Sequence, residues 1–236
     1  MYRDVKILGL IPARGGSKGI KDKNICRICG KPLISYTIEA ANTSKYLDDV
    51  VVTTNDPKIA DTARAYGASV PFMRPEELAR DTSLSIEALM HAIHTLHDMG
   101  KNFDIVLFLQ PTSPLRTSAD IDASIEEFFK MGRQSLASVS PVRDHPLLMR
   151  TVGADGRLTN MLNQSSTCRR QDMPPYYRVN GAIYIYNVAE LSLNTSLNDA
   201  LVPYIMEKSH AVDIDNLGDI CLAEYYLNNT IDTTSL

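Results

Sequence analysis

The chain has 236 residues, of which 44% are hydrophobic and 22% charged, and its formal net charge at pH 7 is −4. These ordinary values exclude a disordered chain, a collagen-like fibre and a small disulfide scaffold. No apolar run approaches the roughly 20 residues of a membrane span, and an acidic chain without tryptophan is a poor candidate for coating nucleic acid. Cysteines are sparse and the first residues show no signal-peptide pattern, so we expect a cytoplasmic protein that binds neither membrane nor nucleic acid.

The first two thirds of the chain alternate short apolar runs with amphipathic helical patterns. We expect strands at 5–11, 50–54, 69–73, 105–109 and 136–142. We expect helices at about 32–42, from the 55–57 cap to about 66, at 83–99 and at 118–131. Strands that alternate with crossover helices imply a mostly parallel, right-handedly wound sheet. The sequence therefore predicts a Rossmann-like α/β fold, as a single domain over residues 1–236.

The pattern changes after residue 141. Residues 143–178 are polar, contain prolines and are only weakly periodic, whereas regular patterning returns at 181–186. A last strand is expected at 211–215, followed by a C-terminal helix capped by Asn216. A polar and aromatic segment without a core of its own suggests docking on another subunit. We therefore interpret 143–178 as a small dimerisation arm and expect a homodimer.

A basic, glycine-rich loop follows the first expected strand, in the run LIPARGGSKGI at residues 10–20. Open α/β sheets bind ligands at this end of their strands. Glycines let backbone N–H groups approach a phosphate, and Arg14, Lys18 and Lys23 add charge-assisted hydrogen bonds. The loop fits neither G-x-x-x-x-G-K-[ST] nor G-x-G-x-x-G. We favour a site for a small, highly charged anion over a solvated basic turn.

Two carboxylates stand close together near the other end of the chain. Asp213 and Asp215 are two apart on the expected strand, so their side chains face the same way, with Cα atoms roughly 7 Å apart. Such a pair can share one Mg²⁺ (or Mn²⁺) ion, completed by waters and phosphate oxygens. Helix capping and solvation are the alternative. Because a phosphate loop occurs in the same chain, we favour the metal.

Several ordered motifs give the sequence a family resemblance. The segments are 11–19, 23–24, 30–34, 74–82 (RPEELARDT), 110–116 (QPTSPLR), 178–184 (RVNGAIY) and 213–215 (DID). In this order they resemble the acylneuraminate cytidylyltransferases, which are CMP-sialic acid synthetases and their legionaminate and pseudaminate relatives. The resemblance spans almost the whole chain. It implies a fold of the nucleotide-diphospho-sugar transferase type, flanked by helices, and a dimer.

The same resemblance implies a reaction. CMP would pass from CTP to the anomeric hydroxyl of a nine-carbon α-keto acid sugar, with release of pyrophosphate, in the synthesis of surface polysaccharides. Arg14, Lys18 and Lys23 would neutralise the leaving phosphates, while Asp213 and Asp215 hold the metal that polarises the α-phosphate. Asp215 or a water molecule is the expected proton acceptor.

The resemblance also implies which residues contact each substrate. The residues expected around the nucleotide are Leu10, Ala13, Arg14, Ser17, Asn24, Arg74 and Ser85. The residues expected around the sugar are Gln110, Thr112, Ser113, Arg116, Arg170, Asn180 and Tyr184. Arg170 is the expected partner of the sugar carboxylate, with Arg178 as the alternative.

Two departures from the family pattern fall in the expected sugar pocket. His145-Pro146-Leu147 is followed by Leu148, where many sialic acid enzymes have Lys, and 196–199 (SLND) lacks an aromatic pair. The identity of the acid sugar therefore stays open among neuraminate, legionaminate and pseudaminate. A 3-deoxy-manno-octulosonate cytidylyltransferase and a non-catalytic nucleotide-sugar binder are the alternatives. Segment 178–181 argues against the first, and the intact loop with both aspartates argues against the second.

Overall fold

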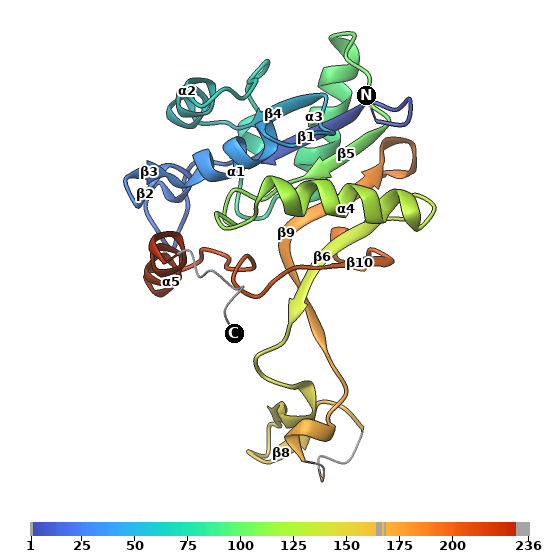
Figure 1. The fold of residues 1–236 in the computed structure, drawn as a ribbon. Coiled ribbons are helices and arrows are strands. Elements are labelled where there is room, and N and C mark those ends of the chain that lie inside the picture. Colours follow the sequence, from blue (N-terminus) through green and yellow to red (C-terminus); the bar gives the residue numbers. More distant parts are fainter. Residues whose placement is uncertain (1, 164–166, 168, 230–236) are drawn as a thin grey trace.

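The computed structural model describes residues 2–163, 167 and 169–229. At its centre lies a six-stranded sheet in the order β10-β6-β9-β5-β1-β4 (Figure 1). Its strands are β1 (Ile7–Pro12), β4 (Asp49–Thr53), β5 (Ile105–Phe108), β6 (Leu136–Pro141), β9 (Tyr177–Asn187) and β10 (Val202–Ile205). β1 pairs in parallel with β4 and β5, and β10 with β6, while β9 runs antiparallel between β5 and β6. The predicted mostly parallel α/β sheet is confirmed.

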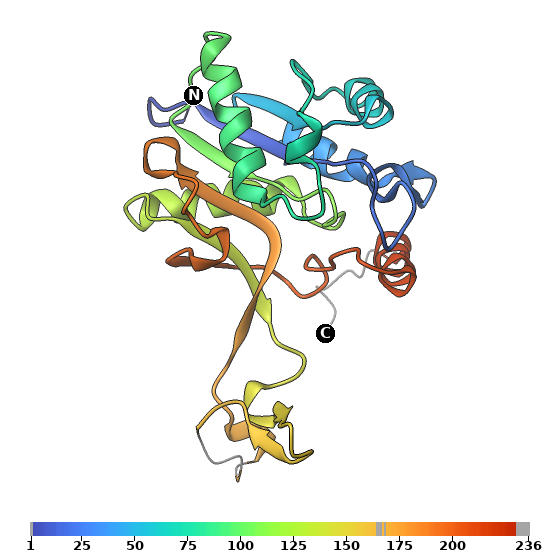
Figure 2. The same ribbon diagram turned by 180° about the vertical axis from the view of Figure 1, so that it is seen from behind.

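Helices cover both faces of this sheet. They are α1 (Leu33–Asn42), α2 (Pro57–Ala65), α3 (Ser85–Asp98), α4 (Ser118–Lys130) and α5 (Leu217–Asn228). In Figure 1, α1 and α4 lie in front of the sheet, and Figure 2 shows α3 on the opposite face. None of the helices in the described ranges is both long enough and apolar enough to cross a membrane.

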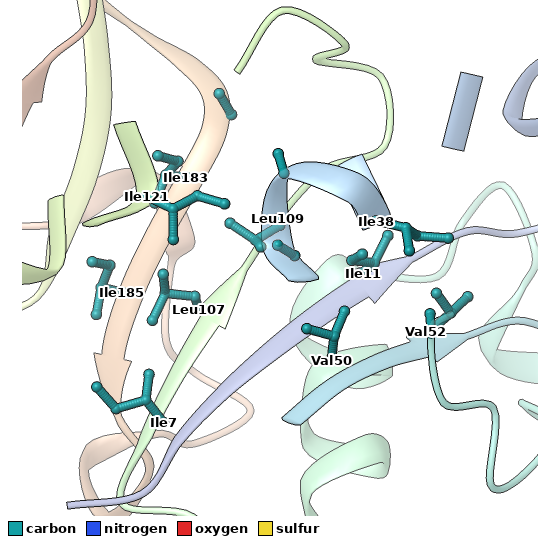
Figure 3. Packing of buried hydrophobic residues seen from close by; sticks show 14 of the residues in the cluster. Ile7, Ile11, Ile38, Val50, Val52, Leu107, Leu109, Ile121, Ile183 and Ile185 are labelled. Carbon is teal, nitrogen blue, oxygen red and sulfur yellow. The ribbon is translucent and has the colours of Figure 1, made fainter. Parts of the chain in front are cut away.

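The two layers follow from strand alternation. Ile7 and Ile11 of β1 pack with α1, α2 and α4 in one core cluster, whereas Leu8 and Leu10 pack with α3 in another. Figure 3 shows the first cluster, in which Ile38 and Ile121 meet side chains from β1, β4, β5 and β9. Both faces of β1 are buried, as its nearly continuous apolar sequence predicts.

Two expected strands are wrong. At 69–73 only Ser69 bridges to β4, and Pro71, two residues later, has no donor N–H. Residues 211–215 form no strand, although the N–H of Ile214 donates to the carbonyl of Thr112 at 2.8 Å. A third small core cluster, which includes Ile20, Ile214 and Ala223 of α5, holds this segment against the basic loop. The predicted Asn216 cap of α5 is confirmed, because its side chain accepts from Gly218 N and Asp219 N.

Most of the segment 143–178 departs from the sheet as expected, but Tyr177 and Arg178 belong to β9 and pair with β6. The outer ends of β6 and β9 form a ribbon that extends away from the main sheet, and the hairpin of β7 (Arg150–Val152) and β8 (Leu158–Asn160) lies beyond it (Figures 1 and 2). We call residues 142–176 the arm. A second small hairpin, β2 (Arg27–Ile28) with β3 (Lys31–Pro32), follows the basic loop.

Candidate active site

A cavity of about 440 Å³ opens where β1 and β5 end. Pro12 and Phe108, the last residues of these strands, lie in its wall. The rest of the lining comes from the basic loop, from 74–88, from 110–112 and from the two aspartates near the C-terminus. The carboxyl edge of a parallel sheet is the usual ligand site in such folds. We call this cavity the polyanion cavity because of the charges that face it.

The basic loop is fixed by its backbone. Ala13 N donates to the carbonyl of Thr53 at 3.0 Å, and Gly15 N donates to Asn55 Oδ1 at 3.0 Å. The buried Asn24 side chain donates from Nδ2 to the carbonyl of Arg14 at 2.9 Å. The loop is thus held in one shape, with Arg14, Ser17 and Lys18 in the cavity lining.

The segment 213–215, which carries Asp213 and Asp215, also lines the cavity and contacts the basic loop. Lys23 Nζ donates to the carbonyl of Ile214 at 2.8 Å and to Asp215 Oδ1 at 3.1 Å. Gly19 lies so close that a Cβ built there would be 3.0 Å from the carbonyl oxygen of Asp215. The cationic loop and the carboxylate pair therefore line a single cavity.

The two carboxylates have different surroundings. Burial, more than any other cause, raises the pKa of Asp213, and the nearby charge of Asp215 raises it further. Asp213 Oδ1 is buried without a hydrogen-bond partner in the described structure, whereas Asp215 is exposed to solvent. The described residues contain no cluster of three or more His, Cys, Asp or Glu side chains that could hold a metal alone. Two carboxylates with an unsatisfied oxygen fit Mg²⁺, which usually completes its shell with waters and phosphate oxygens.

Arg74 forms a fixed charge in the cavity wall. Its side chain is buried and donates from Nη2 to the carbonyl of Thr53 at 2.5 Å and from Nε to Thr53 Oγ1 at 3.2 Å. Burial, assisted by the charge of Arg14, lowers the pKa of Arg74 to about 10. It remains cationic at neutral pH and, held by two bonds, presents its charge with little freedom to move.

A second cavity of about 430 Å³ adjoins the first. Leu84, Ser85 and Gln110 line both cavities. The remaining lining is uncharged and comes from Ile86, from residues 193–198 and from Tyr184, whose Oη donates to Asn198 Oδ1 at 3.0 Å. We call it the neutral cavity. Together the two hollows form one elongated site with a charged half and a neutral half.

Most of the expected site residues line these cavities. They are Arg14, Ser17, Lys18, Lys23, Asn24, Arg74, Ser85, Gln110, Thr112, Tyr184, Asp213 and Asp215. Five other described residues do not, and Leu10, Ala13 and Ser113 are the first three of them. The carbonyl of Leu10 accepts from Leu109 N, the N–H of Ala13 is taken by Thr53, and Ser113 is buried. Their backbone or side-chain groups serve the sheet and the loop that carry the site.

Two polar residues expected to bind sugar lie inside the protein instead. Arg116 is buried and donates from Nη1 to the carbonyls of Gln110 and Ala182. Asn180 is buried at the irregularity between β6 and β9, where its Oδ1 accepts from Ser138 Oγ and from Ala182 N. Neither lines the two cavities. Arg170 begins a 3-10 turn of the arm (Arg170–Asp172), and its side chain lies outside the described part of the chain.

The sequence analysis missed Asp81, the acidic partner of the basic loop. Asp81 binds Arg14 Nη1 at 2.8 Å and Lys18 Nζ at 2.7 Å. The hydrogen bond from Lys18, and then that from Arg14, lowers the pKa of this carboxyl. Asp81 follows the 3-10 turn Glu76–Leu78 within the motif at 74–82, but no spacing rule joins it to a loop 60 residues earlier. Arg80, Ser83 and Leu84 of the same segment also line the polyanion cavity.

Asp81→Asn should strengthen polyanion binding. The change removes a carboxylate that competes for Arg14 and Lys18, so inorganic triphosphate should bind about two- to fivefold more tightly, an effect that weakens as salt is added. Isothermal titration calorimetry measures the affinity. Glu77→Gln is the matched control, because it removes one negative charge from the same segment without an ion pair to the loop. Weaker triphosphate binding by Asp81→Asn would show that Asp81 supports the anion site.

The chain is similar to known proteins over most of its length. The family model described as Cytidylyltransferase matches residues 8–191. Over 225 residues, covering 93% of this chain and 95% of the relative, the sequence is 37% identical to a CMP-N,N'-diacetyllegionaminic acid synthase of Legionella pneumophila. It is 31% identical over 222 residues to a pseudaminic acid cytidylyltransferase of Campylobacter jejuni, covering 93% and 95% of the two chains.

One further sequence relative is about twice as long as this chain, and one solved structure has a similar fold. An N-acylneuraminate cytidylyltransferase of Streptococcus agalactiae is 37% identical over 221 residues, which are 91% of this chain but 52% of that protein. Among solved structures, a CMP:2-keto-3-deoxy-manno-octonic acid synthetase complexed with CTP has a TM-score of 0.70 at 17% identity and covers 96% of this chain and 100% of that one. At that identity, the structural likeness supports the fold alone.

Proposed function

The chain belongs to the cytidylyltransferase family, and on that premise we propose that it transfers CMP from CTP to a nine-carbon α-keto acid sugar, with release of pyrophosphate. The observation that carries the proposal is the single cavity in which the basic loop meets Asp213 and Asp215. The names of two relatives matched over nearly their full length support a sugar of the legionaminate or pseudaminate type. The neuraminate type is supported by a relative of which this chain covers 52%. A cytoplasmic location and a role in surface polysaccharide synthesis belong to the same proposal.

The polyanion cavity would take the nucleotide. Arg14, Lys18 and Lys23 face it from one loop and would bind the phosphate oxygens. Asn24 and the fixed charge of Arg74 would lie near the base and ribose. Because triphosphate and carboxylates are both anionic, these cations must offset a strong repulsion when the substrate binds.

The reaction is a displacement at phosphorus. The anomeric hydroxyl oxygen forms a bond to the α-phosphorus, and the bond from this phosphorus to the oxygen shared with the β-phosphate breaks. Pyrophosphate leaves with that electron pair, and the hydroxyl proton passes to Asp215 or to a water molecule. Arg14, Lys18 and Lys23 would stabilise the negative charge that grows on the leaving group.

Asp213 and Asp215 would hold a divalent ion, Mg²⁺ or Mn²⁺. When bound, such an ion supplies positive charge that polarises a phosphoryl oxygen. The two aspartates contribute a pair of carboxylates, of which Asp213 Oδ1 is already desolvated and without a partner in the described structure.

The neutral cavity would take the acid sugar. Its lining offers hydroxyl and amide groups from Ser85, Gln110, Tyr184 and Asn198, which suit sugar hydroxyl and acylamino groups. No charged side chain of the described residues lines it. The sugar carboxylate therefore needs a cation from elsewhere, and we assign that role to Arg170 of a second copy of the chain.

The arm supports this assignment to a homodimer. It extends away from the sheet (Figure 2) and exposes apolar side chains, among them Leu148, Val152, Leu158 and Met161. Neighbouring exposed apolar residues on a segment without its own core indicate an interaction surface. A symmetric dimer would cover this surface and carry each arm toward the site of the other subunit.

Pyrophosphate release tests the function directly. With CTP and Mg²⁺, we expect release with one or more of N-acylneuraminate, legionaminate and pseudaminate, none without an acid sugar, and none in EDTA. Asp215→Asn should lower kcat at least about 100-fold, because a metal and proton site is lost. Asp199→Asn, an exposed acid outside both cavities, should keep its activity.

Each departure from this pattern removes a defined part of the proposal. Equal rates with and without EDTA would exclude a role for the metal. An unchanged rate for Asp215→Asn would exclude that residue from the mechanism. Release with 3-deoxy-manno-octulosonate alone would reassign the sugar. Binding of CTP without turnover on any of the four sugars would make the protein a nucleotide binder.

Leu158→Glu should disrupt the dimer, because it introduces a charge into the apolar surface of the arm. Analytical ultracentrifugation should then show monomers, whereas Leu201→Glu, similarly exposed but outside the arm, should leave dimers.

A mixture of two inactive variants tests the shared site. When Arg170→Ala and Asp215→Asn subunits pair at random, half of the dimers contain one of each and gain one intact site, so about a quarter of all sites should recover activity. No recovery on mixing, with dimers intact, would place Arg170 outside the partner's site.

A further inference from the structure

Gln110 lies at the boundary between the two cavities. It follows Leu109 at the end of β5 and lines both hollows. Leu84 and Ser85 also line both cavities. Of these three residues, Gln110 has the side-chain amide, which can donate and accept hydrogen bonds at the same time. In the proposed reaction, this is where the sugar hydroxyl meets the α-phosphate.

Gly181 makes room for the Gln110 side chain. It lies on β9 next to β5, with a φ of +80° that residues with a Cβ rarely adopt. A Cβ built there would lie 2.6 Å from Gln110 Oε1 and 3.4 Å from Gln110 Cδ. The amide oxygen thus fills the space that any other side chain at position 181 would need.

Arg116 fixes the Gln110 backbone from the interior. Its Nη1 donates to the carbonyl of Gln110 at 3.1 Å and to the carbonyl of Ala182 at 2.7 Å. The guanidinium therefore ties Gln110 to the residue that follows Gly181. Arg116 is buried, and its Nε and Nη2 have no partner in the described structure, so its burial has a free-energy cost that other contacts must offset. Burial lowers its pKa to about 9, which still leaves it cationic at neutral pH.

Two residues from different elements thus act on one side chain. We propose that Gly181 and Arg116 are positioning residues, which hold the Gln110 amide at the boundary of the two cavities so that it orients the acid sugar for attack. The inference rests on the proposed function. Neither residue lines the cavities, and both act through Gln110.

The position of Gln110 separates two kinetic effects. A displaced amide disturbs the sugar, whereas CTP keeps its contacts to Arg14, Lys18 and Lys23. Loss of Gly181 should therefore lower kcat/KM for the sugar about 100-fold, the size expected for a misplacement of about 1 Å, while KM for CTP stays within about twofold. A purely structural role would change both substrates together.

A double-mutant cycle tests the coupling. Gly181→Ala, Gln110→Ala and the double variant are compared in steady-state kinetics. With Gln110 already truncated, Gly181→Ala should cause little further loss, because the amide that it displaces is gone. Gly100→Ala is the matched control, since Gly100 has a φ of +77° with nothing within 4 Å of a built Cβ. It should leave the kinetics unchanged, and independent effects of Gly181→Ala and Gln110→Ala would overturn the proposal.

The same cycle in urea unfolding does not depend on activity. In the wild-type background, Gly181→Ala should lower the free energy of unfolding more than Gly100→Ala does. In the Gln110→Ala background, the two glycine substitutions should lower it by about the same amount. If wild type transfers CMP to no sugar, the proposed function fails while this cycle still decides the packing. If wild type is active and the cycle is additive, the positioning role fails alone.

Arg116 is tested by a conservative pair. Arg116→Met removes the donor to both carbonyls and should lower kcat/KM for the sugar with KM for CTP retained. Arg116→Lys keeps a cation that can donate and should recover part of the loss. Equal behaviour of the two folded variants, or a parallel loss of CTP affinity, would contradict a positioning role.

Discussion

The partly buried Lys23 side chain joins the basic loop to the aspartate segment in the polyanion cavity, which is the candidate active site. It donates to the carbonyl of Ile214 and to the carboxylate of Asp215, 192 residues later in the sequence. Without such a cation, a carboxylate pair and a polyphosphate could not occupy one small cavity, because their charges repel. The third core cluster supports the same junction by packing Ile20 of the basic loop with Ile214 and with Ala223 of α5. The chemistry proposed for this protein depends on that junction.

The rest of the fold serves this arrangement in two ways. Parallel pairing of β1, β4 and β5 brings their carboxyl ends to one edge, so the loops after them share a wall. The antiparallel insertion of β9 between β5 and β6 then places Gly181 and Ala182 beside Gln110. If β9 were parallel to its neighbours, the loop after it would lie at this position instead. One strand therefore contributes to the neutral half of the site and, at its other end, to the ribbon that carries the arm.

Much of the fold could be predicted because buried parallel strands have a strong sequence signal. The expected strands at 50–54 and 105–109 match Asp49–Thr53 and Ile105–Phe108 closely, since continuous apolar runs with β-branched residues suit strands that are buried on both faces. The strand expected at 69–73 failed because Pro71 cannot continue an edge pairing. The short strand β10 was missed because Pro203, which has no donor N–H, lies within its apolar run.

The site was predictable where charge and spacing were unusual, as for Arg14, Lys18 and the aspartate pair. Sequence does not show on which side of a loop a polar residue lies, so Arg116 and Asn180 were expected in the sugar pocket, although both satisfy backbone groups in the interior. Asp81 and Gly181 matter through contacts with residues distant in sequence.

A crystal structure with CTP and Mn²⁺ is the most direct test of whether the basic loop and the aspartate pair act on one triphosphate. We expect an anomalous peak between Asp213 and Asp215, with the triphosphate bound to Arg14 and Lys18. A triphosphate bound away from the aspartates would show that the two regions do not act on one substrate.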